Sequence, residues 1–275
     1  MDFITNTDLA WSSFANKKVL VVGANGVLPA YMIETFLYLN DKKNMAIQVL
    51  GLVRNKKKAI KKFKCYQGRK DFRLLQRDIT QPFTIKGKVN YIIHAASQAS
   101  PKYYNLDPVG TLLANVVGTY HLLELAKRKV VENFLYFSSG EIYGRLSKPA
   151  VPTNESMYGA IDPLDIRSSY GESKKMGENM CVAYAHQFGL PIKIVRPYHS
   201  YGPGITLDDG RVFADFVADI VLGRDIIIYG NGSEIRSFCY LSDATLGFFT
   251  VLLKGKNSEA YNVGNPTCLL SIEKL

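Results

Sequence analysis

The sequence of 275 residues predicts an α/β fold, a doubly wound parallel sheet with a small C-terminal lobe. Two observations carry this prediction. Short apolar runs alternate with segments whose apolar residues recur at helical spacing, which is typical of parallel sheets with right-handed crossovers. After about residue 197, glycine and proline become frequent and the expected elements become shorter, which indicates a change of architecture.

The alternating elements can be placed in order. The first apolar run, 19–23, is continuous, as expected for a strand that is covered on both faces. Further strands are expected at 47–53, 91–95, 134–138 and 192–196, and helices at 31–39, 112–128 and 170–188. Ligands of such sheets bind at the carboxyl ends of the strands. We therefore expect residues 23–26, Arg54, 94–97 and 138–144 to line one site.

A tight glycine turn comes directly after the first expected strand. Gly23 and Gly26 would let the backbone approach a pyrophosphate, which the N-terminus of the next helix would bind. A glycine pair alone is as easily a plain turn, but its position directly after a strand near the N-terminus favours dinucleotide binding. The predicted sheet is therefore of the Rossmann type.

Tyr170 and Lys174 form a second pattern with chemical meaning. Residues four apart on a helix lie on one face, one turn from each other. A nearby ammonium stabilises a phenolate, so the tyrosine could act as a base near neutral pH. The hydroxyl of Ser139, at the end of another strand, could bind the oxygen that is oxidised. This arrangement is suited to proton-coupled hydride transfer.

Composition excludes several classes of protein. The net charge is +10, with much of it at 54–58 and 61–64, and such runs are by default solvated faces. Neither aromatic interleaving nor a recognised module accompanies them, so we expect no nucleic-acid binding. No apolar run reaches the ~20 residues of a membrane span, and no secretory signal is visible. The four cysteines lack metal-ligand spacing and are expected to be reduced thiols, so we predict no metal site and a cytoplasmic protein.

Several longer motifs resemble a known family. They are His-Ala-Ala-Ser-Gln-Ala-Ser-Pro at 94–101, Asn-Val-Val-Gly-Thr at 115–119, Asp-Gly-Arg-Val at 209–212, and the stretch 229–238. Together they resemble the extended short-chain dehydrogenase/reductase family, in its NAD-dependent nucleotide-sugar epimerase/dehydratase branch. Within that branch the chain is especially similar to UDP-glucuronate decarboxylases and to dTDP-glucose 4,6-dehydratases.

The resemblance implies a division of the chain and a substrate. Residues 1–196 would form the dinucleotide-binding domain with the catalytic side chains, and 197–275 a smaller lobe that binds a nucleotide-diphosphate sugar. The final residues, 271–275, look like a helix that is just beginning, which favours a lobe that is incomplete or a sequence shortened relative to its relatives.

The resemblance also implies the chemistry. In that family the sugar's C4 hydroxyl is oxidised by the bound nicotinamide to a 4-keto intermediate. Tyr170 would be the base, Lys174 its electrostatic partner and ribose ligand, and Ser139 the hydroxyl anchor. Glu141 resembles the glutamate that acts at C5 in dehydratases and lies by the sugar in decarboxylases; the alternative is a surface carboxylate at a strand end.

The same resemblance implies the cofactor and substrate residues. Asp78 and Ile79 resemble the pair that holds the adenine ring, and Arg236 resembles the arginine that clamps the diphosphate through its guanidinium fork. The expected cofactor ligands are Gly23, Asn25, Gly26, Val27, Arg54, Asp78, Ile79, Ala95, Ala96, Asn115, Tyr170, Lys174 and Pro197. The expected substrate ligands are Ser97, His199, Arg211 and Arg236.

Four positions depart from the family pattern. Pro29 occupies the third glycine position of the turn, where a first helical turn tolerates proline. Gly140 stands where dehydratases have an aspartic acid and decarboxylases a serine, so loss of a C6 hydroxyl would lack its usual proton donor. His199 replaces an asparagine, and it could bind phosphate or sugar or only pack in the loop. Arg54 stands where NAD users place an acidic residue, which favours NADP over NAD through its 2′-phosphate.

The leading hypothesis is an NAD(P)-dependent nucleotide-sugar enzyme that dehydrates or decarboxylates the 4-keto intermediate with the help of Glu141. A C4 epimerase is the alternative, and a non-catalytic protein that keeps the cofactor is the third. Relatives form homodimers through two helices that correspond to 112–128 and 170–188, so we expect a homodimer, although core burial explains the same apolar spacing.

Overall fold

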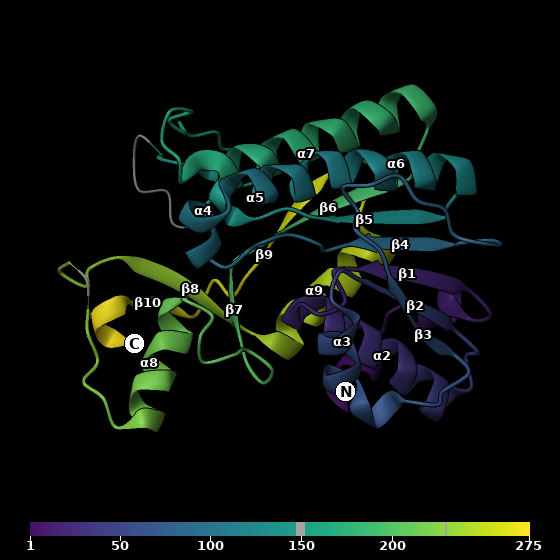
Figure 1. Ribbon diagram of the computed structural model, residues 1–275, viewed down its shortest axis with the longest axis horizontal. Helices are drawn as coiled ribbons and strands as arrows, with labels where there is room; N and C mark the ends of the chain where they lie inside the picture. Colours follow the sequence, from purple (N-terminus) through teal and green to yellow (C-terminus); the bar gives the residue numbers. More distant parts are fainter. Residues whose placement is uncertain (147–151, 229) are drawn as a thin grey trace.

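The computed structural model describes residues 1–146, 152–228 and 230–275, and a parallel sheet of seven strands forms its centre (Figure 1). The strand order is β3-β2-β1-β4-β5-β6-β9, and every neighbouring pair is parallel. The order reverses between β1 and β4, which is where doubly wound sheets bind their ligands. The strands are β1 (Lys18–Val22), β2 (Gln48–Val53), β3 (Phe72–Gln76), β4 (Tyr91–His94), β5 (Asn133–Phe137), β6 (Ile192–Pro197) and β9 (Ala260–Val263).

Helices cover both faces of the sheet (Figure 1). One face carries α1 (Asp2–Thr5), α2 (Val27–Lys43), α3 (Lys56–Lys62) and α9 (Leu241–Lys254), and the other carries α4 (Lys102–Leu106), α5 (Pro108–Asn115), α6 (Val117–Lys129) and α7 (Ser168–Phe188). Successive residues of a strand point to opposite faces. In β1, Val19 and Val21 accordingly pack in the core on the α2 and α9 side, while Leu20 and Val22 pack on the α6 and α7 side. This two-sided burial explains the continuous apolar run, and it confirms the predicted fold class.

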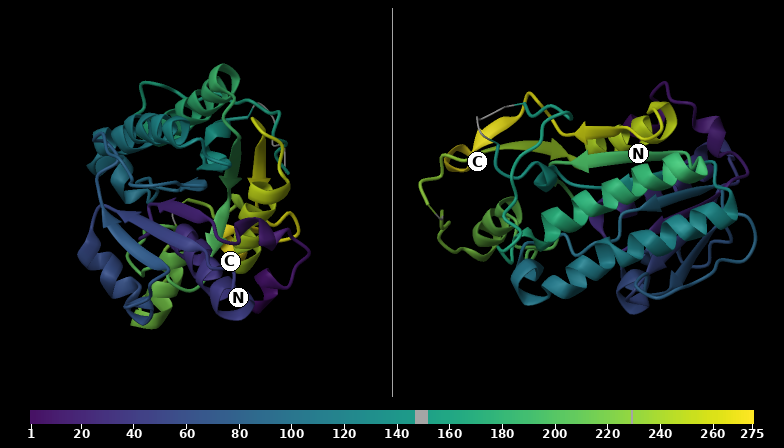
Figure 2. Two further views of the ribbon diagram at one scale, coloured as in Figure 1. Left: turned by 90° about the vertical axis from the view of Figure 1, so that its right-hand side faces the viewer. Right: turned by 90° about the horizontal axis from the view of Figure 1, so that it is seen from above.

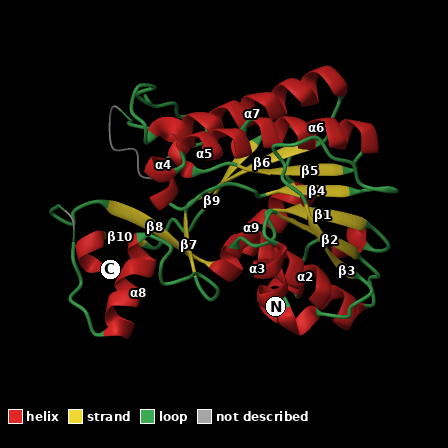
Figure 3. Ribbon diagram, viewed as in Figure 1, coloured by secondary structure: helices red, strands yellow, loops and turns green. Residues whose placement is uncertain are grey.

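A smaller sheet extends beyond the carboxyl ends of the main strands (Figure 3). It has the order β10-β8-β7, with β7 parallel and β10 antiparallel to β8. Its elements are β7 (His199–Tyr201), β8 (Ile235–Tyr240) and β10 (Leu269–Ser271), with α8 (Val212–Leu222) beside them. The short helices η1 (Trp11–Phe14), η2 (Lys64–Tyr66), η3 (Gly140–Tyr143) and η4 (Ile272–Lys274) complete the described elements.

The predicted division at residue 196 needs one correction. The chain enters the lobe after β6, but it returns to the main sheet with α9 and β9. Phe248 and Phe249 of α9 are fully buried in the same core as Phe14 and Phe36 of the N-terminal part. The stretch 197–275 therefore contributes to both parts, because the apolar face of α9 has to be buried against the sheet.

Two further differences concern single elements. The helix expected at 112–128 is divided at Val116 into α5 and α6, whereas the helix expected at 170–188 is the single α7 (Figure 2). The strand β3 was not expected, because its sequence Phe-Arg-Leu-Leu-Gln lacks both a continuous apolar run and a strict alternation. Among the described helices, none combines the length and the apolar character that crossing a membrane requires.

Candidate active site

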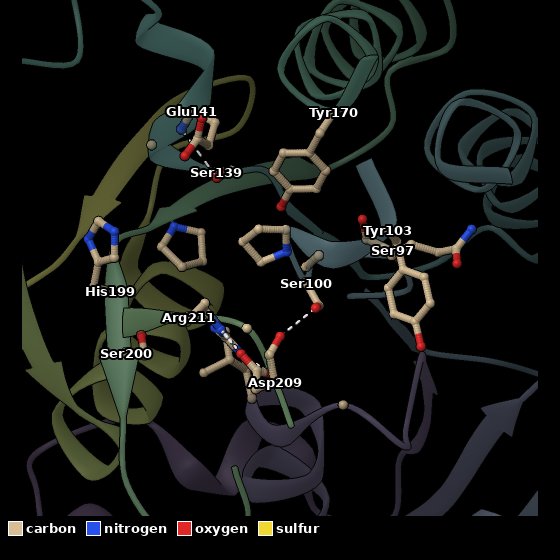
Figure 4. Close-up of a pocket in the computed structure, with 18 of the residues that line it drawn as sticks. Ser97, Ser100, Tyr103, Ser139, Glu141, Tyr170, His199, Ser200, Asp209 and Arg211 are labelled. Carbon is tan, nitrogen blue, oxygen red and sulfur yellow. Dashed lines mark hydrogen bonds and ion pairs between the residues drawn. The ribbon is translucent and has the colours of Figure 1, made fainter. Parts of the chain in front are cut away.

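A cleft of about 2800 Å³ lies at the carboxyl ends of the main strands and continues into the lobe. All of the predicted catalytic, cofactor and substrate residues line it except Asn115. Figure 4 shows Tyr170 pointing into this space from α7, with Ser139 and Glu141 on one side and Ser97 on the other. His199 and Arg211 approach from the lobe (Figure 4). The site is therefore built from both parts of the molecule.

The glycine turn after β1 leaves room for an anion. Gly23 has a φ of +82°, and a Cβ at this position would lie 2.6 Å from the Cα of Ala96. Gly26 is the N-cap of α2 and supplies no side-chain hydrogen bond, so the first N–H groups of this helix remain available. The buried Oδ1 of Asn25 has no hydrogen-bond partner among the described residues. The close approach at Gly23 and the free N–H groups of α2 fit the pyrophosphate of a dinucleotide. The Asn25 oxygen only accepts hydrogen bonds, so it would need a donor such as a hydroxyl group.

Pro29 is accommodated in the first turn of α2. It is buried, and it is the third residue after the cap Gly26. The N–H groups of this turn have no partner within the helix, so the missing N–H of proline costs no helical hydrogen bond. The departure from the glycine pattern leaves the turn intact.

The residues expected near the adenosine lie together at one end of the cleft. Arg54 follows β2, is exposed and lines the cleft. The exposed Lys58 and Arg77 and the half-buried Lys62 line it as well. Oδ1 of Asp78 accepts hydrogen bonds from the N–H and the hydroxyl of Thr80, both at 2.9 Å. This end of the cleft is consequently rich in cations.

The Tyr170 phenol is buried. Only 6% of its surface is exposed, and burial raises its pKa to about 12, while the side chains of Ser139 and Ser97 beside it partly offset this effect. The Lys174 ammonium lies 5.8 Å from the centre of the Tyr170 ring. The phenol pKa is therefore raised rather than lowered, because desolvation outweighs the effects of Ser139, Arg211 and Ser97.

Lys174 is directed into the protein rather than into open solvent. Its Nζ donates a 2.6 Å hydrogen bond to the carbonyl oxygen of Phe137, and the residue is 2% exposed. Burial lowers its pKa to about 7, against the opposing effect of Glu178. A lysine with this pKa can gain or lose a proton near neutrality.

A buried ion pair holds the η3 turn that carries Glu141. Arg196 of β6 binds Glu178 of α7 with two hydrogen bonds of 2.9 and 2.7 Å, and its Nη1 donates to the hydroxyl of Tyr143 at 2.8 Å. The Tyr143 hydroxyl in turn donates to Oδ1 of Asn262 in β9 at 2.7 Å. Since β6, β9 and α7 are linked through Tyr143, the turn is fixed relative to Tyr170.

Within this turn, Ser139 and Glu141 face the cleft. Oγ of Ser139 accepts the backbone N–H of Glu141 at 3.2 Å and so caps η3. Oε2 of Glu141 lies 3.5 Å from Nη1 of Arg167, and 43% of the Glu141 side chain is exposed. At Gly140, a Cβ would lie 3.3 Å from the Tyr198 ring, so a larger side chain would require this ring to move.

The lobe supplies the polar side chains expected to bind substrate. Arg211 pairs with both carboxylate oxygens of Asp209, and Arg236 lies 3.6 Å from Glu234. Burial and the neighbouring Arg236 and Arg211 lower the pKa of His199 to about 4. A neutral imidazole can exchange hydrogen bonds with a sugar hydroxyl, but it adds no charge for a phosphate at neutral pH.

Asn115 lies behind the site rather than in it. It is fully buried, and its Nδ2 donates to the hydroxyl of Ser173 at 2.9 Å. Sequence reasoning also missed Tyr104 and Arg167, which both line the cleft. Tyr104 belongs to the segment that follows the 94–101 motif, but no spacing rule distinguishes a stacking aromatic from a core residue.

Three features are typical of a dinucleotide-dependent enzyme: the reversal of strand order, the open glycine turn, and the convergence of Ser139, Tyr170 and Lys174. Comparison with known proteins supports this assignment. The model of the NAD dependent epimerase/dehydratase family matches residues 19–264. The chain belongs to this family, which confirms the resemblance predicted from the sequence.

Individual relatives support the same family membership. The chain is 35% identical to UDP-glucuronic acid decarboxylase 6 of Arabidopsis thaliana over 253 residues, which cover 92% of this chain and 70% of the relative. It is 33% identical to UDP-glucuronic acid decarboxylase 1 of Xenopus tropicalis over 91% of this chain and 56% of the relative.

Solved structures are similar over nearly the whole chain. UDP-glucuronic acid 4-epimerase from Bacillus cereus in complex with NAD has a TM-score of 0.79 at 25% identity and covers 94% of this chain and 81% of its own. A dTDP-glucose 4,6-dehydratase from Streptomyces venezuelae, solved with NAD, has a TM-score of 0.79 at 22% identity, covering 93% and 78%. The latter similarity is one of fold.

Proposed function

We propose that this protein decarboxylates a nucleotide-linked uronic acid through a 4-keto intermediate. The observation that carries the proposal is the convergence of Tyr170, Ser139 and Glu141 on one cleft in which position 140 is a glycine packed against Tyr198. A dehydration would need an acid to protonate the departing hydroxyl, and position 140 supplies none. Loss of carbon dioxide needs no such acid. The 35% sequence identity to a UDP-glucuronic acid decarboxylase supports the same interpretation.

The proposed reaction begins at the C4 hydroxyl. Ser139 orients this hydroxyl by a hydrogen bond, and Tyr170 takes its proton. A bound oxidised nicotinamide supplies a hydride acceptor and a positive charge, which opposes the desolvation that keeps Tyr170 protonated. The C4 hydrogen leaves as hydride and a ketone forms.

The ketone makes loss of the carboxylate possible. A carboxylate on C5 is β to the new carbonyl group, so the C5–carboxylate bond breaks, carbon dioxide leaves, and the electron pair becomes an enolate. A proton from the solvent is then added to C5, hydride returns to C4, and Tyr170 returns its proton to the C4 oxygen. The net change is loss of carbon dioxide and uptake of one proton. Glu141 and Arg167 border the sugar end of the cleft and help to orient the departing carboxylate.

The cofactor preferred by this chain is proposed to be NADP. Arg54, at the position that would contact the adenosine ribose, is accompanied by Lys58, Lys62 and Arg77 on the same cleft wall. Guanidinium and ammonium groups bind a 2′-phosphate through charge-assisted hydrogen bonds. In fluorescence titrations we expect NADP⁺ to bind at least about tenfold more tightly than NAD⁺, and Arg54→Asp to abolish this ratio. Equal affinities in the unmodified protein would argue for NAD.

We also propose a homodimer. Apolar side chains of α5, α6 and α7 remain exposed, namely Leu112, Leu113, Tyr120, Met176 and Val182. Equilibrium sedimentation of the protein and of Val182→Glu distinguishes a dimer from a monomer.

The four cysteines are free, which supports a reducing compartment such as the cytoplasm.

Product analysis tests the proposed reaction. The protein is incubated with UDP-glucuronate and either dinucleotide, and the products are identified by proton NMR and by trapped carbon dioxide. We expect a UDP-pentose and carbon dioxide, both lost in Tyr170→Phe. A product epimerised at C4 without release of carbon dioxide would favour the epimerase alternative, which the similarity to UDP-glucuronic acid 4-epimerase motivates.

A further inference from the structure

A second tyrosine lies flat against Tyr170. The rings of Tyr104 and Tyr170 are stacked with their centres 4.8 Å apart and their planes 18° apart. Both residues are almost completely buried, with 5% and 6% of their surfaces exposed. The stack joins α4 to α7 across the edge of the cleft, so the proposed base is covered on one face by a neutral aromatic ring.

The position of Tyr104 is itself fixed. Its hydroxyl donates a 3.1 Å hydrogen bond to the carbonyl oxygen of Ala99, in the loop between β4 and α4. Its backbone N–H donates to the carbonyl oxygen of Pro101 at 3.1 Å, within the same loop. The ring therefore cannot turn away from Tyr170 without breaking a contact, and it presents its face rather than its hydroxyl to the base.

Polar groups approach Tyr170 from its other sides. The Lys174 ammonium lies 5.8 Å from the centre of the Tyr170 ring and 5.2 Å from the centre of the Tyr136 ring of β5. The remaining neighbours that act on its phenol are Ser139 and Glu141 from η3, Ser97 from the loop after β4, and Arg211 from the loop before α8. Tyr104 thus contributes no charge of its own to this environment, and its effect on the phenol is to exclude water and to restrict motion.

We propose that Tyr104 is a positioning residue for Tyr170, holding its side chain in the orientation that reaches the substrate hydroxyl and keeping water from one face of its ring. An exposed phenolate is stabilised by water, so a covered one is harder to form until the substrate and cofactor are bound. The stack accordingly delays ionisation of the base until the site is filled. The catalytic part of this role rests on the proposed function of Tyr170.

Three substitutions of Tyr104 distinguish the contribution of its ring from that of its hydroxyl. Tyr104→Phe keeps the stack and loses the bond to Ala99, whereas Tyr104→Leu loses the stack. Tyr104→Met is a second apolar replacement if the leucine variant does not fold. Leu106→Ala, on the same short helix, is the control, because Leu106 is 77% exposed and does not line the cleft.

The first readout requires no turnover. Protein labelled with ¹³C at the ζ carbon of tyrosine reports ionisation of each phenol by NMR, and Tyr170→Phe assigns the Tyr170 signal. In the unmodified protein we expect this signal to keep its neutral position through about pH 10, the ordinary pKa of tyrosine. In Tyr104→Leu the titration should begin about one pH unit lower, because the free energy of stacking two aromatic rings corresponds to a shift of about one pKa unit.

The second readout is catalytic. We expect kcat of Tyr104→Leu to fall about tenfold, with KM and cofactor affinity changed less than about twofold, because the stack orients the base and not the ligands. Leu106→Ala should leave the Tyr170 titration and kcat unchanged, and Tyr104→Phe should change both less than Tyr104→Leu does. An unmoved Tyr170 titration in the folded Leu or Met variant, or an equal effect of the Phe variant, would overturn the proposal. Absence of turnover in the unmodified protein would instead refute the proposed function, while the NMR titration would still decide the role of Tyr104.

Discussion

The buried ion pair between Arg196 and Glu178 leads to a quantitative prediction. The two side chains are 7% and 12% exposed and are joined by two hydrogen bonds. Glu178→Gln keeps the volume of the side chain but removes its charge, and it turns one acceptor oxygen into an amide that faces the guanidinium. Arginine stays protonated in proteins, so Arg196 would remain a buried cation without its counter-charge.

The magnitude depends on the surroundings of Arg196. Removing one partner of a buried pair costs about 3–5 kcal/mol. Arg196 keeps its hydrogen bonds to the Tyr143 hydroxyl and to the Glu155 carbonyl oxygen, at 2.8 and 2.9 Å, so we expect the lower end of this range. A loss of about 3 kcal/mol corresponds to a decrease in Tm of roughly 6–12 °C for a protein of this size.

Urea denaturation and differential scanning calorimetry measure the effect. Glu172→Gln on the same helix is the matched control, because its pair with Lys175 spans 3.9 Å and both side chains are about a third or more exposed. We expect this control to lose less than about 0.5 kcal/mol. A Glu178→Gln variant that is no less stable than the control would refute the reasoning about the buried pair.

The remaining predictions concern two glycines and a lysine. Gly23→Ala should abolish dinucleotide binding, measured by fluorescence titration, because its Cβ would lie 2.6 Å from Ala96 at a φ of +82°. Gly177→Ala should lower the denaturation midpoint although alanine favours helices, since its Cβ would lie 2.0 Å from the Tyr136 hydroxyl oxygen; an increase would contradict the packing. Burial lowers the pKa of Lys174 from 10.5 to about 7. Between these two pH values the unfolded chain therefore binds more protons than the folded protein. The free energy of unfolding should therefore rise with pH in this window, and Lys174→Met should reduce the slope.

Much of the main sheet could be predicted because its strands are short and buried on both faces. The runs at 19–23 and 134–138 are apolar almost throughout, and burial on both faces requires this of them. The strands β3 and β9 carry weaker patterns at the two edges of the sheet, and β9 comes after a long excursion through the lobe. No local signal indicates that residues 260–263 return to pair with β6.

Side chains that adjoin a recognisable motif could be predicted, and those defined only by packing could not. Ser139, Glu141, Tyr170 and Lys174 belong to motifs, and all four line the cleft. Asn115 was expected to contact the cofactor, but its direction depends on the packing of α5 against α7. The stack of Tyr104 on Tyr170 joins residues 66 positions apart, so it requires the tertiary structure.

We propose that this chain oxidises C4 of a nucleotide-linked uronic acid and then releases its carboxylate as carbon dioxide. The most direct measurement uses UDP-glucuronate with deuterium at C4 and mass spectrometry of the nucleotide product. We predict a product lighter by one carbon dioxide that retains the deuterium, because the hydride that leaves C4 returns to C4. An unchanged mass, or loss of carbon dioxide with loss of the deuterium, would contradict it.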